Sequence, residues 1–408
     1  MRLGKDQQEF AAAIREFSGR ECGTLAQRDA VTENGTQANS PQILAKLAAL
    51  GWLGVSLPAE YGGGGAGFVD ECVFLEESSR GLLPINGYGS GLTAAQTYLR
   101  WGSEEQKRTI VGNLVAGRLE SIALSEPGAG SDLGAVGLQA ARSGDGYVVN
   151  GQKTWISSAH VAENLLVLVR EDSPGGKHEG LTLLMIPARA PGVEIRPIAT
   201  MEAHTVNDVF FSDVRVPESA VVGQPRNAWK QLMRGLCVER LIISAMSLGA
   251  AQRSLDDLIA YVREREQFGR KIASFQALRH RIADLATDIE FGRSFLYDAA
   301  QRVDDGEEDE LARESSMAKL RTTEIAKNTA LEAVQMMGGY GYAREYGMEG
   351  QVRRALAPPI YGGTNEIQRE IIGKSLLSLA ATAWDCRRRT GSWLPRTRRC
   401  RSHGCCSR

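Results

Sequence analysis

Residues 146–170 read GYVVNGQKTWISSAHVAENLLVLVR, and this stretch decides the fold class of the chain. Valine, isoleucine, threonine and aromatic residues gather there in short runs, which is typical of β-strands. Asn150-Gly151 lies between two of these runs and predicts a hairpin turn. Further β-rich runs lie on both sides: SIALSE (121–126), LTLLMIP (181–187), GVEIRPI (192–198) and DVFFSDVRVP (208–217). We therefore expect an antiparallel β-domain over residues 121–225.

Both flanks of this β-domain have helical periodicity. On the N-terminal side, QILAKLAALGWLGV (42–55) and DECVFLEESSRGL (70–82) repeat apolar residues at helical spacing, and Ser40-Pro41 suits an N-cap and first turn. The longest helical pattern of the chain is LMRGLCVERLIISAMSLGAAQRSLDDLIAYVRER (232–265). The sequence thus predicts a helical domain over residues 1–120 and a second one over 226–378. This mixed α and β order does not suit a doubly wound parallel sheet, in which strands alternate with helices.

Composition excludes several classes of protein. The 408 residues contain 48 Lys+Arg against 49 Asp+Glu, a balance that does not favour a nucleic-acid or anionic-membrane partner. The chain has no apolar run of the roughly 20 residues that cross a bilayer, and it begins with an amphipathic pattern instead of a leader pattern. We therefore expect a cytoplasmic protein without membrane insertion.

Residues 379–408 differ from the rest in composition. They hold eight Arg against one Asp, together with His403 and four of the seven Cys. The cysteines lack the paired Cys-x-x-Cys spacing of a zinc site, so we expect no metal and interpret the segment as a basic, disordered tail. The other cysteines lie in apolar contexts and are expected to be reduced, buried thiols: Cys22, Cys72 and Cys237.

Two glycine-rich stretches are candidates for cofactor binding. YGGGGAG (61–67) satisfies G-x-G-x-x-G but follows no predicted strand, so we interpret it as a loop and not as a dinucleotide fingerprint. SEPGAGSD (125–132) could direct backbone N–H groups and the hydroxyls of Ser125 and Ser131 at a ligand. Nearby, Trp155 and Ser157 would project from one face of a strand, where they suit a planar heterocycle. Taken alone, an ordinary turn and a core Trp explain these two features more simply.

Five segments in this order resemble the acyl-CoA dehydrogenase family: ALSEPGAGSDLGA (123–135), NGQKTWISSA (150–159), REREQFGRKIASFQ (263–276), QMMGGYGYAREY (335–346) and IYGGTNEIQREIIG (360–373). The resemblance covers roughly residues 5–378. It implies a helical N-terminal domain, a middle β-domain and a C-terminal four-helix bundle, with FAD as cofactor, an acyl-CoA as substrate and a role in β-oxidation of fatty acids. It also implies an electron-transfer flavoprotein as acceptor and a homotetramer or homodimer.

The resemblance also implies roles for individual residues. Those expected to contact FAD are Ser125, Ser131, Trp155, Ser157, Arg265, Gln267, Phe268, Gln276, Gln335, Gly338, Gly339, Thr364 and Glu366. Those expected to contact the substrate are Ser131, Arg240, Tyr361, Gly362 and Gly363. Arg265 and Phe268, three apart at a predicted helix end, would share a face and meet the FAD pyrophosphate and ribose, often from a neighbouring subunit. Thr364 and Glu366 lie at the predicted start of a terminal helix, where capping alone also explains Thr364.

Dehydrogenation of an acyl thioester requires a base that removes the α proton while hydride leaves the β carbon for flavin N5. Many family members place this Glu directly after the Tyr of the YxGT segment, where this chain has Gly362. Glu239 matches the position used by the isovaleryl-CoA and long-chain acyl-CoA dehydrogenases. Apolar residues surround it on its helix and no cation lies three or four positions away, so its pKa should be raised. The alternative is a Glu paired with an Arg from another helix.

Three hypotheses about function follow from these residues. The first is an FAD-dependent dehydrogenase that converts an acyl-CoA to the trans-2-enoyl-CoA with Glu239 as the base. The second is a non-catalytic partner subunit of a hetero-oligomeric acyl-CoA dehydrogenase. The third keeps the fold and changes the reaction to that of a flavin oxidase or a monooxygenase, and Glu239 argues against the monooxygenase because that reaction needs no α-proton base.

Overall fold

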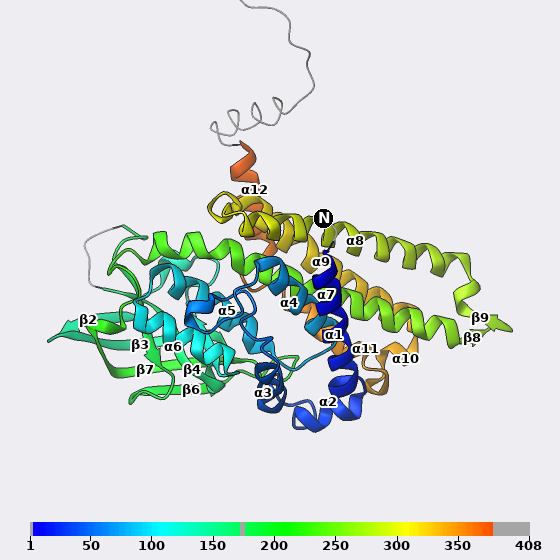
Figure 1. Cartoon of the computed structure of the whole chain (residues 1–408), viewed down its shortest axis with the longest axis horizontal. Coiled ribbons are helices and arrows are strands. Elements are labelled where there is room, and N and C mark those ends of the chain that lie inside the picture. Colours follow the sequence, from blue (N-terminus) through cyan, green and yellow to red (C-terminus); the bar gives the residue numbers. More distant parts are fainter. Residues whose placement is uncertain (1–2, 172–175, 378–408) are drawn as a thin grey trace, which may run out of the picture.

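The computed structural model describes residues 3–171 and 176–377, so the tail predicted over 379–408 lies outside the described residues. Helices at the start of the chain, a β-sheet and a bundle of long helices follow one another along the sequence (Figure 1). The predicted order of helices, strands and helices is confirmed.

The helices before the sheet pack around apolar stripes. The α-helices described in this part are α1 (Lys5–Cys22), α2 (Leu25–Val31), α3 (Pro41–Ala49), α4 (Phe68–Arg80), α5 (Asn86–Trp101) and α6 (Glu104–Val115). The predicted cap of α3 is confirmed, because the Ser40 side chain accepts a hydrogen bond from the Ile43 N–H and Pro41 occupies the first turn. The glycine-rich stretch 61–67 is a loop after a short 3₁₀ turn and follows no strand.

The seven-stranded sheet has the order β1-β4-β2-β3-β7-β6, with β5 paired to β4. Its strands are β1 (Leu119–Ala123), β2 (Gln139–Ser143), β3 (Gly146–Ser157), β4 (Ala162–Arg170), β5 (Leu181–Pro187), β6 (Val193–Pro197) and β7 (Val206–Pro217). Most pairs are antiparallel, but β4 lies parallel to β1 and, at one residue pair, to β2. The sheet is therefore mixed: β1, the strand that follows α6, pairs in parallel with β4, and β4 separates it from the β2–β3 hairpin.

The predicted turn at Asn150-Gly151 is wrong. β3 runs through both residues, and the hairpin between β2 and β3 turns instead at Gly144-Asp145. At Asn150 the register against β7 shifts, and the Asn150 side chain bonds to Asp213 through both its amide oxygen and its amide nitrogen. The Asn-Gly pair thus forms a β-bulge, in which Gly151 has a φ of 136°.

The long helices after the sheet form the C-terminal bundle. Its α-helices among the described residues are α7 (Ala228–Glu264), α8 (Gln276–Asp304), α9 (Ala312–Met337), α10 (Gly339–Tyr342), α11 (Met348–Leu356) and α12 (Asn365–Leu377). A two-stranded hairpin, β8 (Glu266–Gln267) and β9 (Arg270–Lys271), connects α7 to α8. α7 also packs against α4 and α5, so one hydrophobic core includes helices that precede the sheet in the sequence and helices that follow it. A second core lies within the β-domain.

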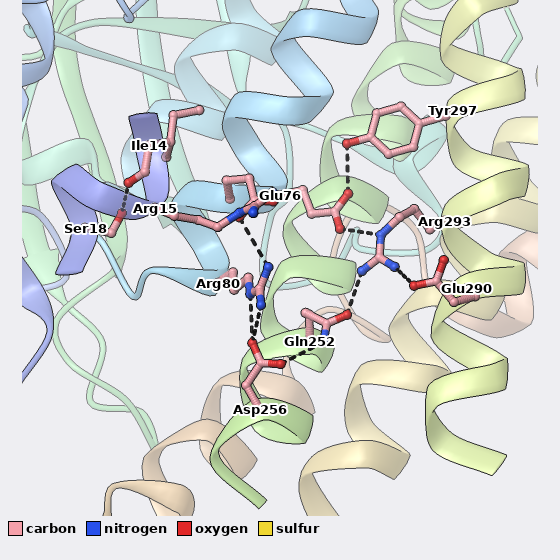
Figure 2. Close-up of polar contacts among 11 residues, drawn as sticks. Ile14, Arg15, Ser18, Glu76, Arg80, Gln252, Asp256, Glu290, Arg293 and Tyr297 are labelled. Carbon is pink, nitrogen blue, oxygen red and sulfur yellow. Dashed lines mark hydrogen bonds and ion pairs between the residues drawn. The ribbon is translucent and has the colours of Figure 1, made fainter. Parts of the chain in front are cut away.

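Ion pairs and a hydrogen bond connect α4 to this bundle. Glu76 of α4 is 4% exposed, accepts a hydrogen bond from the Tyr297 hydroxyl at 2.9 Å and forms an ion pair with Arg293 at 2.7 Å (Figure 2). Arg80, one turn further along α4, pairs with Asp256 of α7. The buried carboxylate is therefore satisfied by two partners, which specifies how α4, α7 and α8 pack.

The cysteine prediction agrees with the structure, in which Cys22, Cys72 and Cys237 are free and buried. Within residues 3–171 and 176–377, no helix is long and apolar enough to cross a membrane. The same described residues contain no cluster of three His, Cys, Asp or Glu side chains that could hold a metal ion.

Candidate active site

Glu239 lies in the first third of α7 on a stretch whose other side chains are buried. Among the described residues from Cys237 to Ala245, Glu239 alone keeps partial solvent access. No cation forms an ion pair with it among the side chains that the structure describes, so the alternative of an interhelical ion pair is not found there. Burial raises the pKa of Glu239, and the nearby charges of Arg240 and Lys319 oppose this only in part. The raised pKa predicted from the sequence is confirmed.

The Glu239 carboxylate borders the turn that leads into α12. Gly362 has a φ of 62°, and the Cβ atom that it lacks would lie 3.9 Å from Oε1 of Glu239 and against Cδ1 of Ile243. A side chain at position 362 would therefore enter the space that the Glu239 carboxylate borders. A carboxylate at 239 and one at 362 are thus two ways to place an acid at the same point of this fold.

A buried network holds this turn. The Lys319 ammonium of α9 donates to the Gly363 carbonyl at 2.8 Å and to Oδ1 of Asn365 at 3.1 Å. The Gln368 side-chain amide donates to the carbonyls of Gly362 and Gly363 at 3.1 and 3.0 Å. Lys319 and Gln368 are 0% exposed. The sequence analysis did not identify these residues; the available signal was a Lys in a helix whose neighbours three and four positions away are small, uncharged Ser and Thr.

Thr364 and Glu366 lie where they were predicted, at the N-terminus of α12. Thr364 Oγ1 accepts a hydrogen bond from the Ile367 N–H at 3.3 Å, and Glu366 is exposed. Capping is therefore one role of Thr364. Tyr361, directly before the turn, is 46% exposed. Arg240 is only 7% exposed, and its Nε has no partner among the described groups, which leaves one buried donor available to a ligand.

Trp155 is not a core residue. Its side chain is 60% exposed, and its φ of 62° is a left-handed conformation that a bulky residue rarely adopts. The register between β3 and β7 shifts between Lys153 and Ile156, so a bulge carries Trp155 out of the strand pattern. An exposed, strained aromatic at a strand end is typical of a ligand-contacting residue. Ser157, at the end of β3, is partly exposed.

The predicted SEPGAGSD loop lies beside this bulge. The Thr154 N–H donates to the Ser125 carbonyl at 2.9 Å, which places the loop next to Trp155. Glu126 and Ala129 exchange two backbone hydrogen bonds, so part of the loop is a tight turn. Gly128 is exposed, and a Cβ atom built on it would have no neighbouring atom within 4 Å. Ser131 is also exposed. The loop thus leaves an open surface beside Trp155.

A groove of about 630 Å³ lies at the far end of α7. Six of the residues predicted to bind FAD line it: Arg265, Gln267, Phe268, Gln335, Gly338 and Gly339. Phe268 is 92% exposed, and no atom lies within 4 Å of the Cβ positions of the two glycines. The structure thus brings together two segments that are far apart in the sequence. Gln276 begins α8 just after Phe275, which also lines the groove, and Gln276 itself is exposed.

The predicted helical spacing of Arg265 and Phe268 is wrong. α7 ends at Glu264, and Arg265 has an extended conformation that leads into the β8–β9 hairpin. Phe268 and Gly269 form its two-residue turn, both with positive φ, which matches the twist of a tight hairpin. The Arg265 guanidinium stacks over the Tyr340 ring at 5.0 Å. A turn and a ring contact, not a helix face, therefore place the two side chains in one groove.

One chain does not bring all predicted FAD contacts to one place. Glu239 and Arg265 are 26 residues apart along or just beyond α7, which corresponds to about 39 Å at 1.5 Å per residue. Ser158, next to Ser157, packs against Gly87 of α5, and Gly89 of the same helix packs against Ile242 and Met246 of α7. The end of β3 is therefore close to the Glu239 region, whereas the β8–β9 hairpin lies at the opposite end of α7 (Figure 1).

Family models match nearly the whole described chain. The acyl-CoA dehydrogenase N-terminal domain matches residues 4–118, the middle domain matches 121–214 and the C-terminal domain matches 228–377. The chain belongs to the acyl-CoA dehydrogenase family. It is an oxidoreductase, and the members of this family are flavoproteins.

Individual relatives agree with this family. "Probable acyl-CoA dehydrogenase YngJ" of Bacillus subtilis is 35% identical over 92% of this chain and 99% of its own length. The mitochondrial short/branched chain specific acyl-CoA dehydrogenase of Rattus norvegicus is 34% identical over 89% of this chain and 84% of its own. The crystal structure of an acyl-CoA dehydrogenase from Geobacillus kaustophilus has a TM-score of 0.84 at 32% identity, covering 92% of this chain and 99% of its own.

A solved relative also contains a flavin. It is the crystal structure of a glutaryl-CoA dehydrogenase from Mycobacterium smegmatis in complex with FADH2, and it has a TM-score of 0.81 at 25% identity. The match covers 92% of the present chain and 95% of the relative.

Proposed function

We propose that this family member oxidises the α,β bond of an acyl-CoA to the trans-2-enoyl-CoA, with Glu239 as the base that removes the α proton. The observation that carries the proposal is the place of its carboxylate. It borders the Gly362 turn, on a buried stretch of helix where it has no ion-pair partner among the described side chains. An enclosed carboxylate with a raised pKa binds a proton more strongly than an exposed one, which suits a general base acting on a carbon acid.

The turn itself supplies a second element of the proposed reaction. Among the described residues the Gly362 N–H donates to no other group, so it is available to the carbonyl of a thioester. A backbone donor there would stabilise the negative charge that develops on the thioester oxygen as the α proton leaves. Gly363 and Tyr361 flank this donor, and Arg240 follows Glu239 on α7. These residues form the proposed substrate contacts together with Ser131.

The chain's residues fit an FAD. Trp155, Ser157 and the loop containing Ser125 and Ser131 offer an exposed aromatic beside hydroxyl donors, and Thr364 and Glu366 lie near the turn. A bound flavin would supply the acceptor for the hydride from the β carbon. The groove at the other end of α7 offers an arginine for the pyrophosphate and two glycines with open space, and Gln276 lies beside it.

Because Glu239 and Arg265 are about 39 Å apart along α7 and the groove lies at the Arg265 end, we infer that the groove of one chain completes the FAD site of a second copy. A homodimer or homotetramer then follows from the location of the proposed cofactor contacts.

The test is a bleaching experiment with the purified, FAD-loaded chain. A panel of acyl-CoA substrates is added without oxygen, and the flavin absorbance near its visible maximum is followed. We expect at least one acyl-CoA to bleach the flavin and the trans-2-enoyl-CoA to appear in equal amount. Absence of bleaching across the panel would contradict the proposal and favour a non-catalytic subunit. Hydrogen peroxide formed at the rate of turnover in air would identify an oxidase.

A further inference from the structure

Lys319 is a buried cation that makes no direct ion pair with a described carboxylate. Its side chain is 0% exposed, and among the described residues it forms no ion pair. Its ammonium instead donates to two neutral oxygens, the Gly363 carbonyl and Oδ1 of Asn365. A buried lysine with no direct ion pair is costly for a fold, so its presence points to a role beyond packing.

The two acceptors of Lys319 belong to the turn that Glu239 faces. Gly362 and Gly363 both have positive φ, at 62° and 77°. Asn365 is 4% exposed and is held in place by Thr323, whose hydroxyl and the Asn365 amide bond at 3.1–3.2 Å. The ammonium thus holds the Gly363 carbonyl before Thr364 and the Asn365 side chain after it. Loss of this clamp would release the turn that carries the Gly362 N–H.

The same ammonium acts electrostatically on Glu239. Burial lowers the pKa of Lys319 to about 8, and the negative charge of Glu239 is the main influence that opposes this. In return, Arg240 and, to a lesser extent, Lys319 are the cations that lower the pKa of Glu239 against the effect of burial. The other ionisable groups nearby are Tyr361, whose pKa is raised so that it stays neutral, and Glu366, which acts weakly on Lys319.

We propose that Lys319 is a positioning residue of this site: its ammonium clamps the Gly362–Gly363 turn and, together with Arg240, supplies the positive charge that favours the ionised Glu239 carboxylate. The proposal rests on the proposed role of Glu239 as the base. Lys319 touches neither the substrate nor the cofactor and acts through the turn and through Glu239. Below the pKa of Lys319 the cation is present and favours the charged, proton-accepting form of Glu239.

The test substitutes Lys319→Met, which removes the charge and both donors but keeps the length of the side chain. Lys327→Met, a lysine on the same helix away from the turn, is the matched control. The first readout is the pH profile of flavin reduction in a single turnover with an excess of acyl-CoA. We expect the acidic limb to move to higher pH in Lys319→Met, with a loss of about tenfold or more at the acidic end. Lys327→Met should follow the wild-type profile.

The second readout needs no turnover. Infrared difference titration follows the C=O band of the protonated Glu239 carboxyl, assigned by its loss in Glu239→Gln. This band should persist to higher pH in Lys319→Met. If Lys319→Met does not fold, Lys319→Gln keeps an amide donor for the Gly363 carbonyl without the charge and should give the same two shifts. Lys319→Arg, which retains the charge, should restore the position of the acidic limb.

An unmoved acidic limb and an unmoved band in either folded, uncharged variant would overturn the proposal. The proposed function and the proposed role of Lys319 are tested by different measurements. If wild-type protein does not bleach with any acyl-CoA, the proposed function fails, while the infrared titration still measures the influence of Lys319 on Glu239.

Discussion

Replacing Glu239 by glutamine should abolish turnover and make the protein more stable. Glutamine keeps the shape of the side chain but cannot accept the α proton. General-base catalysis contributes roughly 10²–10⁴-fold, so the rate of flavin reduction should fall by at least this factor. This loss corresponds to about 2.7–5.4 kcal/mol of activation free energy. FAD content should be unchanged, because Glu239 is not among the proposed cofactor contacts.

The gain in stability follows from the raised pKa of Glu239. The folded chain holds this proton more tightly than the unfolded chain does. The free energy of unfolding therefore falls as the pH rises from the ordinary carboxyl pKa of 4.5 through the folded value, and it stays low above that value. Glu239→Gln removes this loss. Above the folded pKa the variant should be more stable by about 1.4 kcal/mol for each pH unit by which burial raises the pKa.

The assays are stopped-flow bleaching with the best acyl-CoA and thermal or urea unfolding at several pH values, each on FAD-loaded protein. Glu370→Gln is the control, because Glu370 lies on the exposed face of α12 and pairs only with Lys374 at the surface. The control should leave both rate and stability within error of the wild type. Wild-type bleaching by Glu239→Gln would refute the catalytic role, and a loss of stability at neutral pH would refute the reasoning from burial.

Three further substitutions test the remaining parts of the site and fold. Arg265→Ala should weaken FAD binding about tenfold or more by removing the proposed pyrophosphate contact, measured by flavin fluorescence on dilution, whereas exposed Arg263→Ala should not. Gly362→Ala should destabilise the protein by about 1–3 kcal/mol, because it places a Cβ at positive φ against Ile243; an unchanged melting temperature would contradict the turn geometry. Glu76→Ala should cost about 1–3 kcal/mol in unfolding free energy, because Nε of Arg293 and the Tyr297 hydroxyl lose their acceptor while Arg293 keeps Glu290 and Gln252; an unchanged unfolding free energy would show that this network is not formed.

Local sequence patterns predicted most of the elements correctly. The cap at Ser40, the alternation that became β3–β7 and the apolar length of α7 all depend on neighbouring residues, so they can be read from short windows. The environment of Glu239 was also predictable, since the residues three and four positions away from it are apolar or glycine and only burial of the segment satisfies them. The raised pKa follows from that local fact.

Other features depend on partners that are distant in the sequence. Asn150-Gly151 could form a turn or a bulge, and only the pairing of β3 with β7 selected the bulge. The clamp on the Gly362 turn joins Lys319 to residues 44 and 46 positions later, through contacts that no periodicity records. Trp155 is exposed because a register shift at a strand end turned it outward.

The sequence by itself determined the kind of each element and the acid at position 239, because hydrophobic periodicity and turn chemistry are local. Only the tertiary structure decided that this acid borders a glycine turn held by a buried lysine. It also placed Arg265 at the far end of a 37-residue helix, away from Trp155. The physical reason is that an α-helix has a fixed rise per residue, which places Glu239 and Arg265 about 39 Å apart along α7.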